Sequence, residues 1–179
     1  MDNCSVRHTL VALVALVSSS ATAHPVDEVV QAAYLAIEPR QVRLEFDISP
    51  GSAVSGTILR DLDRDGDRRI TTTEARAYGV RVLRRLPLAI DGIRVNWRLD
   101  QVGVPAYGSL AQQADTVRIL AVAPAPLPRG GHLIGFTNAY RPAASVVMTN
   151  VFVRPAGTFR LGRQERSDDG RLYRVRIVT

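Results

Sequence analysis

An acidic segment near the middle of the chain has the residue types and the spacing of a calcium-binding loop. It runs from residue 63 to residue 74 with the sequence Asp-Arg-Asp-Gly-Asp-Arg-Arg-Ile-Thr-Thr-Thr-Glu. Calcium is a hard cation that prefers oxygen ligands, and a twelve-residue EF-hand loop supplies them from positions one, three, five, seven, nine and twelve. These positions are taken, in order, by Asp63, Asp65, Asp67, the backbone carbonyl of Arg69, Thr71 (directly or through water) and Glu74. The segment therefore predicts a calcium site that resembles an EF-hand.

The register of the loop is fixed by the residues between the ligands. Starting at Asp63 places Ile70 where the loop needs an apolar anchor, whereas starting at Asp61 puts Arg68 there and Thr72 at the bidentate position. The first register departs from the usual pattern only at its sixth position, where Arg68 replaces glycine. That position needs a left-handed backbone, which costs a residue with a side chain about 1 kcal/mol or more relative to glycine. We therefore expect a reduced affinity for calcium. Extracellular calcium modules work at dissociation constants of about 10⁻⁴ to 10⁻³ M, so a weak site would still be occupied outside the cytoplasm.

A turn without metal is the alternative interpretation of the same segment. Thr71 and Glu74 have the spacing of a capping box at the start of a helix. The neighbouring arginines, Arg64, Arg68 and Arg69, could neutralise the carboxylates in place of an ion. The two interpretations do not exclude each other, since a helix cap and an ion site can share residues.

The loop must be held by the elements on either side of it. Residues 52–62 and 73–86 have helical rather than alternating apolar spacing, so we expect a helix-loop-helix insertion at about 52–86. Most other apolar runs are short and rich in valine, isoleucine and leucine. Residues 29–37 and 42–48 predict a hairpin whose second strand alternates. Further strands are expected at 88–90, 93–99, 116–122, 133–137, 146–153, 159–164 and 172–178, with Asp-Gly turns at 91–92 and 169–170.

This pattern predicts one mostly β domain over residues 24–179. Frequent short strands with turn signals between them are typical of a sandwich or a barrel, and we expect an antiparallel, Ig-like β-sandwich. Pro124, Pro126 and Pro128 cannot donate to a strand ladder, which predicts an edge or a crossover loop. In the last hairpin Arg171, Arg174 and Arg176 do not share one alternation phase, so we expect a solvated edge rather than a basic stripe.

The first residues have the composition of a secretory signal peptide. Arg7 and His8 precede an apolar run over residues 9–17, and Ala21-Thr-Ala23 matches a cleavage site. The run is shorter than the about twenty apolar residues that a bilayer-spanning helix needs. We therefore expect residues 1–23 to be removed and the mature chain to be periplasmic or secreted and not membrane-spanning.

Composition narrows the chemistry that remains. The single cysteine, Cys4, lies in the predicted signal, so the mature chain offers no disulfide, thiolate ligand or cysteine nucleophile. All 23 basic residues are arginine, and the formal net charge is +6. Outside the cytoplasm such a surface meets lipid headgroups, acidic polysaccharide or acidic protein, so we expect no nucleic-acid partner.

Further motifs accompany the acidic loop. They are His24-Pro-x-Asp27-Glu28, Ile48-Ser-Pro50-Gly51, Glu74-Ala-Arg-Ala-Tyr78 and Gly131-His132-x-x-x-Phe136-x-Asn138. Together with the loop they resemble the extracytoplasmic portion of HupE/UreJ-like proteins, in which such a region precedes a membrane domain associated with nickel or cobalt uptake. The resemblance implies a stand-alone soluble version that works beside a separate membrane transporter.

Two histidines remain after the predicted cleavage, and they support a second hypothesis. His24 would offer both its imidazole and a free α-amine, and His132 could add a third nitrogen for nickel, cobalt or copper. This predicts a metal-handling accessory protein for a membrane transporter.

An enzyme is not expected. The sequence has no Gly-x-Ser-x-Gly elbow and no glycine-rich phosphate loop after a strand. A pair of carboxylates could still serve a hydrolase. The candidates are Asp27, Glu28, Glu38, Glu45 and Asp47, which we assign to a solvated face.

Overall fold

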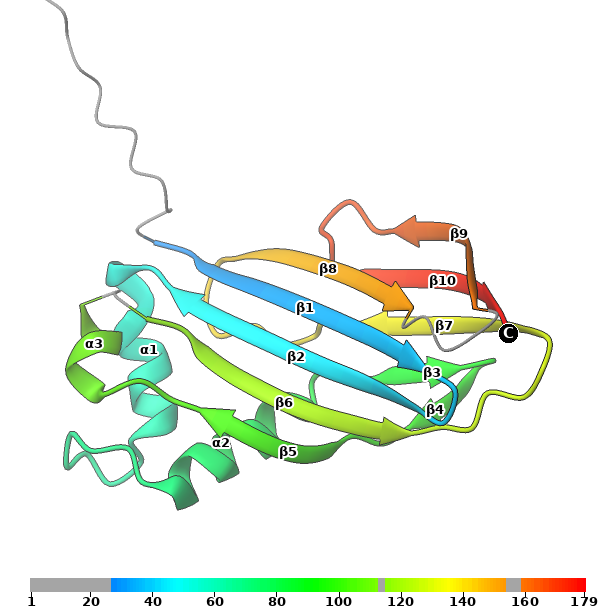
Figure 1. Cartoon of the computed structure of the whole chain (residues 1–179). Coiled ribbons are helices and arrows are strands. Elements are labelled where there is room, and N and C mark those ends of the chain that lie inside the picture. The colour runs from blue at the N-terminus through cyan, green and yellow to red at the C-terminus, as the bar shows by residue number, and fades with distance from the viewer. Residues whose placement is uncertain (1–26, 113–114, 154–158) are drawn as a thin grey trace, which may run out of the picture.

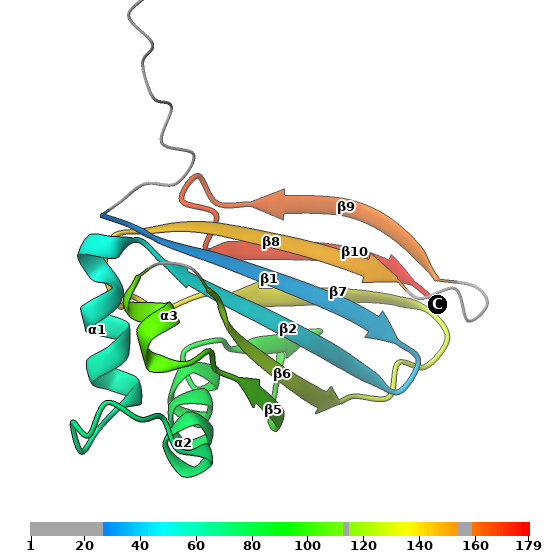
Figure 2. The same cartoon turned by 60° about the vertical axis from the view of Figure 1, so that its left-hand side comes forward.

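The computed structural model describes residues 27–112, 115–153 and 159–179. These residues form two five-stranded sheets that lie face to face, with helices at one end (Figures 1 and 2). The fold is the β-sandwich that the sequence predicts. The predicted signal peptide, Cys4 and His24 lie outside the described residues. No helix in the described parts of the chain is long and apolar enough to cross a bilayer.

The first sheet combines strands from both halves of the chain, whereas the second sheet is formed by strands within residues 88–178. The first sheet has the order β5-β6-β2-β1-β8, formed by Arg98–Gly103, Val117–Pro124, Gln41–Pro50, Val29–Glu38 and Ser145–Val153. The second sheet has the order β4-β3-β7-β10-β9, formed by Ile93–Val95, Leu88–Ile90, Gly131–Thr137, Leu172–Val178 and Arg160–Arg166. Neighbours are antiparallel except β1 and β8, which run parallel. The parallel pair departs from the all-antiparallel prediction, and the Ig-like type of sandwich remains a prediction.

The inner faces of both sheets supply the hydrophobic core. In β2 the residues Val42, Leu44, Phe46 and Ile48 are at most 2% exposed, while the residues between them face outward. This is the alternation that the sequence predicts for the second arm of the hairpin. Burying a side chain of this size stabilises a fold by about 1.5 to 3 kcal/mol, so the alternation determines which face of the strand turns inward.

Two of the connections between the sheets involve segments that the sequence analysis singled out. The run predicted as one strand over 93–99 is divided, because β4 belongs to the second sheet and β5 to the first. Trp97 lies at the division, where its Nε1 donates a hydrogen bond to the Leu86 carbonyl at 2.5 Å. The proline-rich stretch after Pro124 links β6 to β7 across the sandwich, which confirms it as a crossover loop.

A buried polar network fastens the two sheets at another point. In β1 the Gln31 Oε1 accepts a hydrogen bond from Asn138 Nδ2 at 2.7 Å. Arg171 Nη1 donates to the carbonyls of Asn138 and Tyr140 at 3.2 and 3.0 Å. Arg171 is 8% exposed, and its burial lowers the pKa of the guanidinium. Arg171 therefore belongs to the interior and not to the solvated edge.

In the part of the chain that the structure describes, three helices cover one end of the sandwich (Figure 2). α1 spans Ser52–Leu62, α2 spans Thr72–Leu83 and α3 spans Tyr107–Ala111. α1 and α2 confirm the predicted helix pair, although α2 ends before residue 86, and α3 was not predicted. α2 approaches β5 at Gly79, where an added Cβ would lie 2.6 Å from Val102 Cγ2. Only glycine permits this contact without a shift of the Val102 side chain or of one element.

Two hydrogen bonds fix the helix pair further. Arg81 Nη2 in α2 donates to the Asp61 carbonyl in the last turn of α1 at 2.5 Å. The hydroxyls of Tyr78 and Tyr140 lie 2.7 Å apart and join α2 to the connection that follows β7. The two helices therefore enter and leave the acidic loop from fixed positions.

Candidate metal centre

The acidic loop joins α1 to α2 at the helical end of the molecule (Figures 1 and 2). Asp63 caps the C-terminus of α1, and Thr71 caps the N-terminus of α2. The Thr71 hydroxyl accepts a hydrogen bond from the Glu74 backbone N–H, and the Glu74 carboxylate accepts one from the Thr71 N–H. The capping box that the sequence predicts is therefore present.

Hydrogen bonds from the backbone to the aspartates set the path of the loop. The Asp63 carboxylate, in a residue only 8% exposed, accepts from the N–H groups of Gly66 and Arg68 at 2.9 and 3.0 Å. Asp65 and Asp67 each accept one bond from the N–H two residues further along. Arg68 has a φ of 63°, which is the left-handed conformation that its place in the loop predicts. Its bond to Asp63 helps to hold that unfavourable backbone.

The three aspartates converge. Asp63, Asp65 and Asp67 can each direct one carboxylate oxygen so that all three oxygens lie within 4.8 Å of one another. Oxygens that bind one calcium ion at about 2.3 to 2.6 Å lie at most about 5.2 Å apart. The spacing therefore suits three ligands on one ion.

The arginines of the loop do not neutralise these carboxylates. Within residues 61–74, all of which the structure describes, no arginine side chain lies within 4.0 Å of an aspartate oxygen as an ion pair. Arg64, Arg68 and Arg69 are exposed. Neutralisation by intraloop ion pairs, one part of the metal-free interpretation, is therefore not seen in this arrangement.

Glu74 joins the two ends of the loop through hydrogen bonds from Arg64 and Thr71. Its Oε1 accepts a hydrogen bond from the Arg64 N–H at 2.8 Å, and its Oε2 accepts from the N–H and the hydroxyl of Thr71 at 3.0 and 2.8 Å. These bonds, with those from Thr71 the strongest, lower the pKa of Glu74. Of the predicted ligand set, the converging group contains the three aspartates, whereas Glu74 and Thr71 are engaged in the helix cap.

Two further residues of the predicted loop, Arg69 and Ile70, are held by contacts of their own. The N–H of Arg69 donates to Asp67 at 2.7 Å, which fixes the backbone next to the carbonyl that would serve as the fourth ligand. Ile70 packs against the hydrophobic core and confirms its predicted role as the anchor.

His132, the second histidine of the metal-handling hypothesis, uses both ring nitrogens. Nδ1 lies 2.7 Å from Asp91 Oδ2, and Nε2 lies 2.9 Å from the Pro128 carbonyl. The Asp91 carboxylate raises the pKa of His132, and the imidazole lowers the pKa of Asp91. An imidazolium that donates from both nitrogens has no lone pair for a metal. Asp91 was predicted only as a turn residue, and only the folded chain brings it to His132.

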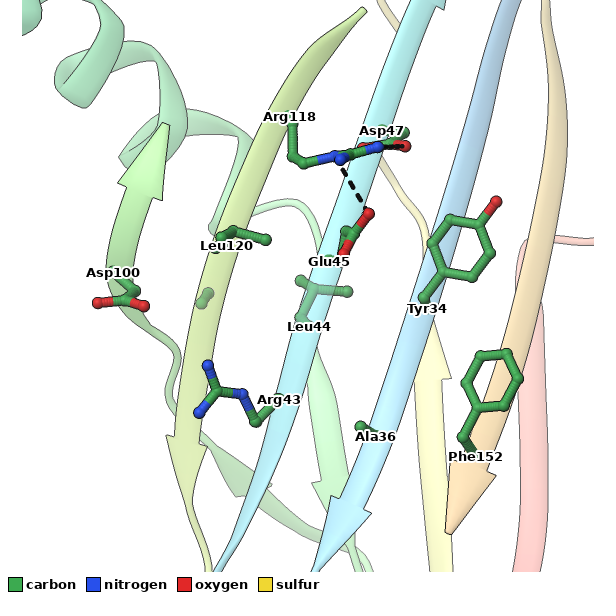
Figure 3. A pocket seen from close by; sticks show the side chains of 11 residues that line it. Tyr34, Ala36, Arg43, Leu44, Glu45, Asp47, Asp100, Arg118, Leu120 and Phe152 are labelled. Atoms are coloured by element: carbon green, nitrogen blue, oxygen red, sulfur yellow. Dashed lines mark hydrogen bonds and ion pairs between the residues drawn. The ribbon is translucent and has the colours of Figure 1, made fainter. Parts of the chain in front are cut away.

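The outer face of the first sheet carries a hollow of about 460 Å³, lined by two arginines and three carboxylates among other residues (Figure 3). Arg118 makes two hydrogen bonds to the Asp47 carboxylate at 2.8 and 2.7 Å and an ion pair with Glu45 at 3.1 Å. These partners raise the pKa of Arg118. Tyr34 and Phe152 stack beside them with ring centroids 6.5 Å apart. Two of the carboxylates considered for catalysis, Glu45 and Asp47, are thus ion-pair partners of Arg118. The sequence analysis did not single out this arginine.

The fold and the loop together define a two-sheet β-sandwich that carries an acidic, helix-flanked loop with three converging carboxylates. No family model matches the chain, and no curated protein and no solved structure is significantly similar to it. The resemblance to HupE/UreJ-like proteins and to the EF-hand therefore rests on the residues of this chain.

Proposed function

We propose that the protein is an extracytoplasmic β-sandwich module that binds one calcium ion in the loop between α1 and α2. One observation carries the proposal: Asp63, Asp65 and Asp67 bring carboxylate oxygens within 4.8 Å of one another, and no arginine pairs with them within the described loop. Three negative charges at this spacing repel each other, and a divalent cation removes the repulsion.

The ion would be held by oxygen atoms alone. Its ligands would be the carboxylates of Asp63, Asp65, Asp67 and Glu74, the carbonyl of Arg69, and Thr71 directly or through water. Glu74 would exchange its bonds from the Thr71 hydroxyl for the ion, so the helix cap and the ion site share this carboxylate. The donor set is that of a hard cation, which favours calcium over nickel, copper or zinc.

The role of the ion would be structural or accessory rather than catalytic. α1 and α2 are already joined by the bond from Arg81 to the Asp61 carbonyl, and α2 is seated on β5 at Gly79. An ion between Asp63, at the end of α1, and Glu74, in the first turn of α2, would fix the angle between the helices. Calcium binding would then hold the helical end of the sandwich in one arrangement.

The place and partner of the module follow from the sequence. The composition of residues 1–23 supports export to the periplasm or the exterior, where weak calcium sites are filled. The resemblance to HupE/UreJ-like proteins supports a membrane transporter as the partner. We propose no enzymatic activity for the chain.

Thermal denaturation in chelator, in magnesium and in calcium tests this proposal. Calcium should raise the melting temperature of the parent protein, and magnesium should raise it less, because magnesium sheds its water reluctantly and needs near-octahedral geometry. Asp63→Ala should remove the calcium effect, and Asp168→Ala, in the β9–β10 turn, should retain it. Equal melting temperatures in chelator and calcium would contradict the proposal.

A further inference from the structure

The outer face of the second sheet gathers arginines that are distant in sequence. In β10, Tyr173, Val175 and Ile177 point into the core, so Arg174 and Arg176 between them point outward. Strand pairing adds two more outward residues, because Arg160 lies opposite Val178 and Arg94 lies opposite Ala89, which itself pairs with Gly135. All four arginines are exposed. We call Arg94, Arg160, Arg174 and Arg176 the basic face.

The basic face has almost no negative charge to balance it. None of its four arginines forms an ion pair with a carboxylate of residues 27–112, 115–153 or 159–179. Glu165 lies opposite Arg174, but its carboxylate is 3.0 Å from Arg163 and is paired there. Positive charges that share one face of a sheet without carboxylate partners repel each other, so this arrangement has a cost in the isolated protein.

The first sheet provides a comparison within the same molecule. Its outer face also carries an exposed arginine on a central strand, Arg118, and supplies it with two carboxylates, Asp47 and Glu45 (Figure 3). The two outer faces have the same architecture but different charge balance. Of the two outer faces, the one on the second sheet therefore carries the unpaired positive charge, and it complements an anionic partner.

Apolar side chains lie among the arginines of the basic face. Leu133 lies opposite Arg176 and is 38% exposed, and Val178 is 51% exposed. A hollow of about 350 Å³ between Arg94 and Arg174 is floored by Pro87, Ala89, Leu133 and Gly135. Tyr173, the aromatic residue of β10, points into the core at 1% exposure. A soluble polyanion gains little from such apolar groups, and nucleic-acid platforms rely on exposed aromatic residues. A bilayer interface accommodates both arginines and aliphatic side chains.

We propose that the basic face docks on an anionic lipid surface. The arginines would contact the headgroup phosphates, while Leu133 and Val178 would meet the boundary between headgroups and acyl chains. This role is independent of the acidic loop, which lies at the helical end of the sandwich. It would place the module on a membrane without a membrane-spanning segment.

Vesicle co-sedimentation in the presence of chelator tests the proposal separately from calcium binding. The protein should sediment with vesicles that mix phosphatidylglycerol with phosphatidylcholine and should stay in solution with phosphatidylcholine alone. Each arginine near an anionic surface contributes about fivefold to partitioning, so Arg174→Gln combined with Arg176→Gln should weaken binding about 25-fold. Binding should also be lost at about 1 M salt, where the Debye length falls to about 3 Å.

A matched control variant loses the same two positive charges, but from the outer face of the first sheet. Arg43→Gln combined with Arg98→Gln removes two exposed arginines from the outer face of the first sheet and should leave vesicle binding within about twofold of the parent, because fields decay within a Debye length. Melting temperatures show whether each protein is folded. Arg94→Gln with Arg160→Gln provides a second pair on the basic face if the first pair unfolds.

Three results would overturn the proposal. The first is that the parent protein does not sediment with phosphatidylglycerol vesicles. The second is that the control pair loses as much binding as the basic-face pair, which would show that net charge alone matters. The third is that soluble polygalacturonate binds in the same salt while vesicles do not, which would assign the face to an acidic polysaccharide.

Discussion

Replacing Asp65 by asparagine should change the stability of the protein in opposite directions with and without calcium. Asp65 is exposed, and its Oδ1 accepts a hydrogen bond from the Asp67 N–H at 3.2 Å. Asparagine retains that acceptor and the shape of the side chain, so Asp65→Asn removes one negative charge and little else.

The magnitude follows from the spacing of the carboxylates. Two unit charges 4.8 Å apart in water repel by about 1 kcal/mol, and Asp65 takes part in two such pairs, with Asp63 and with Asp67. In chelator and low salt the variant should therefore be more stable than the parent by about 1 to 2 kcal/mol. For a domain of this size, each 1 kcal/mol raises the melting temperature by about 2 to 4 °C.

Calcium should reverse the order. Calcium present at about 100 times its dissociation constant stabilises the parent protein by about 2.7 kcal/mol. The variant should lose most of this stabilisation, because it lacks one of the charged ligands and binds calcium more weakly. The parent should then melt above Asp65→Asn. The assay is thermal denaturation followed by circular dichroism, and Asp168→Asn, in the β9–β10 turn, should show no reversal. If Asp65→Asn is more stable than the parent in both conditions, the loop is a solvated turn and the reasoning is refuted.

Three further variants test the elements that hold the loop and the ion pair of the second sheet. Thr71→Ala removes the side-chain cap of α2 and should lower the free energy of unfolding in chelator by about 1 kcal/mol, measured with urea; an unchanged value would show that the cap contributes nothing. Gly79→Ala places a Cβ 2.6 Å from Val102 Cγ2 and should cost about 1 to 3 kcal/mol, which Val102→Ala should largely restore; a fully stable single variant would contradict the close seat of α2 on β5. Because the pKa of His132 is raised above 6.5 and that of Asp91 is lowered below 3.8, their ion pair stabilises the fold between these values and its contribution falls as the pH rises through the raised pKa of His132. The parent should therefore exceed His132→Gln in stability most at mildly acidic pH, and a difference that does not vary between mildly acidic and alkaline pH would argue against this pair.

Local patterns made much of the fold predictable. The alternation of apolar and polar residues over 42–48 is a local pattern that requires only a core on one side of the strand. The burial of alternate side chains in β2 follows this pattern. The two helices, the capping box between Thr71 and Glu74 and the left-handed backbone of Arg68 could also be predicted. Each of these features depends on a few residues that are adjacent in sequence.

Features that depend on distant parts of the chain were not predictable in this way. The parallel pairing of β1 with β8 joins strands more than a hundred residues apart. The division between β4 and β5 depends on which sheet each segment joins. The hydrogen bond from Trp97 to the Leu86 carbonyl forms only when the folded chain brings these two residues together. Charge balance is equally non-local. Arg174 and Arg94 share a face only because β10 and β4 join the same sheet, and Asp91 meets His132 only across β3 and β7.

Calorimetric titration of calcium into chelator-stripped protein that begins at His24 tests the central claim most directly. Glu74→Gln is the control, because glutamine at this position can still form a capping box but lacks the charge of the bidentate ligand. We expect one site in the parent, with a dissociation constant of about 10⁻⁴ to 10⁻³ M, and no site in the variant. No heat up to several millimolar calcium, together with an unchanged melting temperature, would contradict the claim and leave the acidic loop as a capped turn.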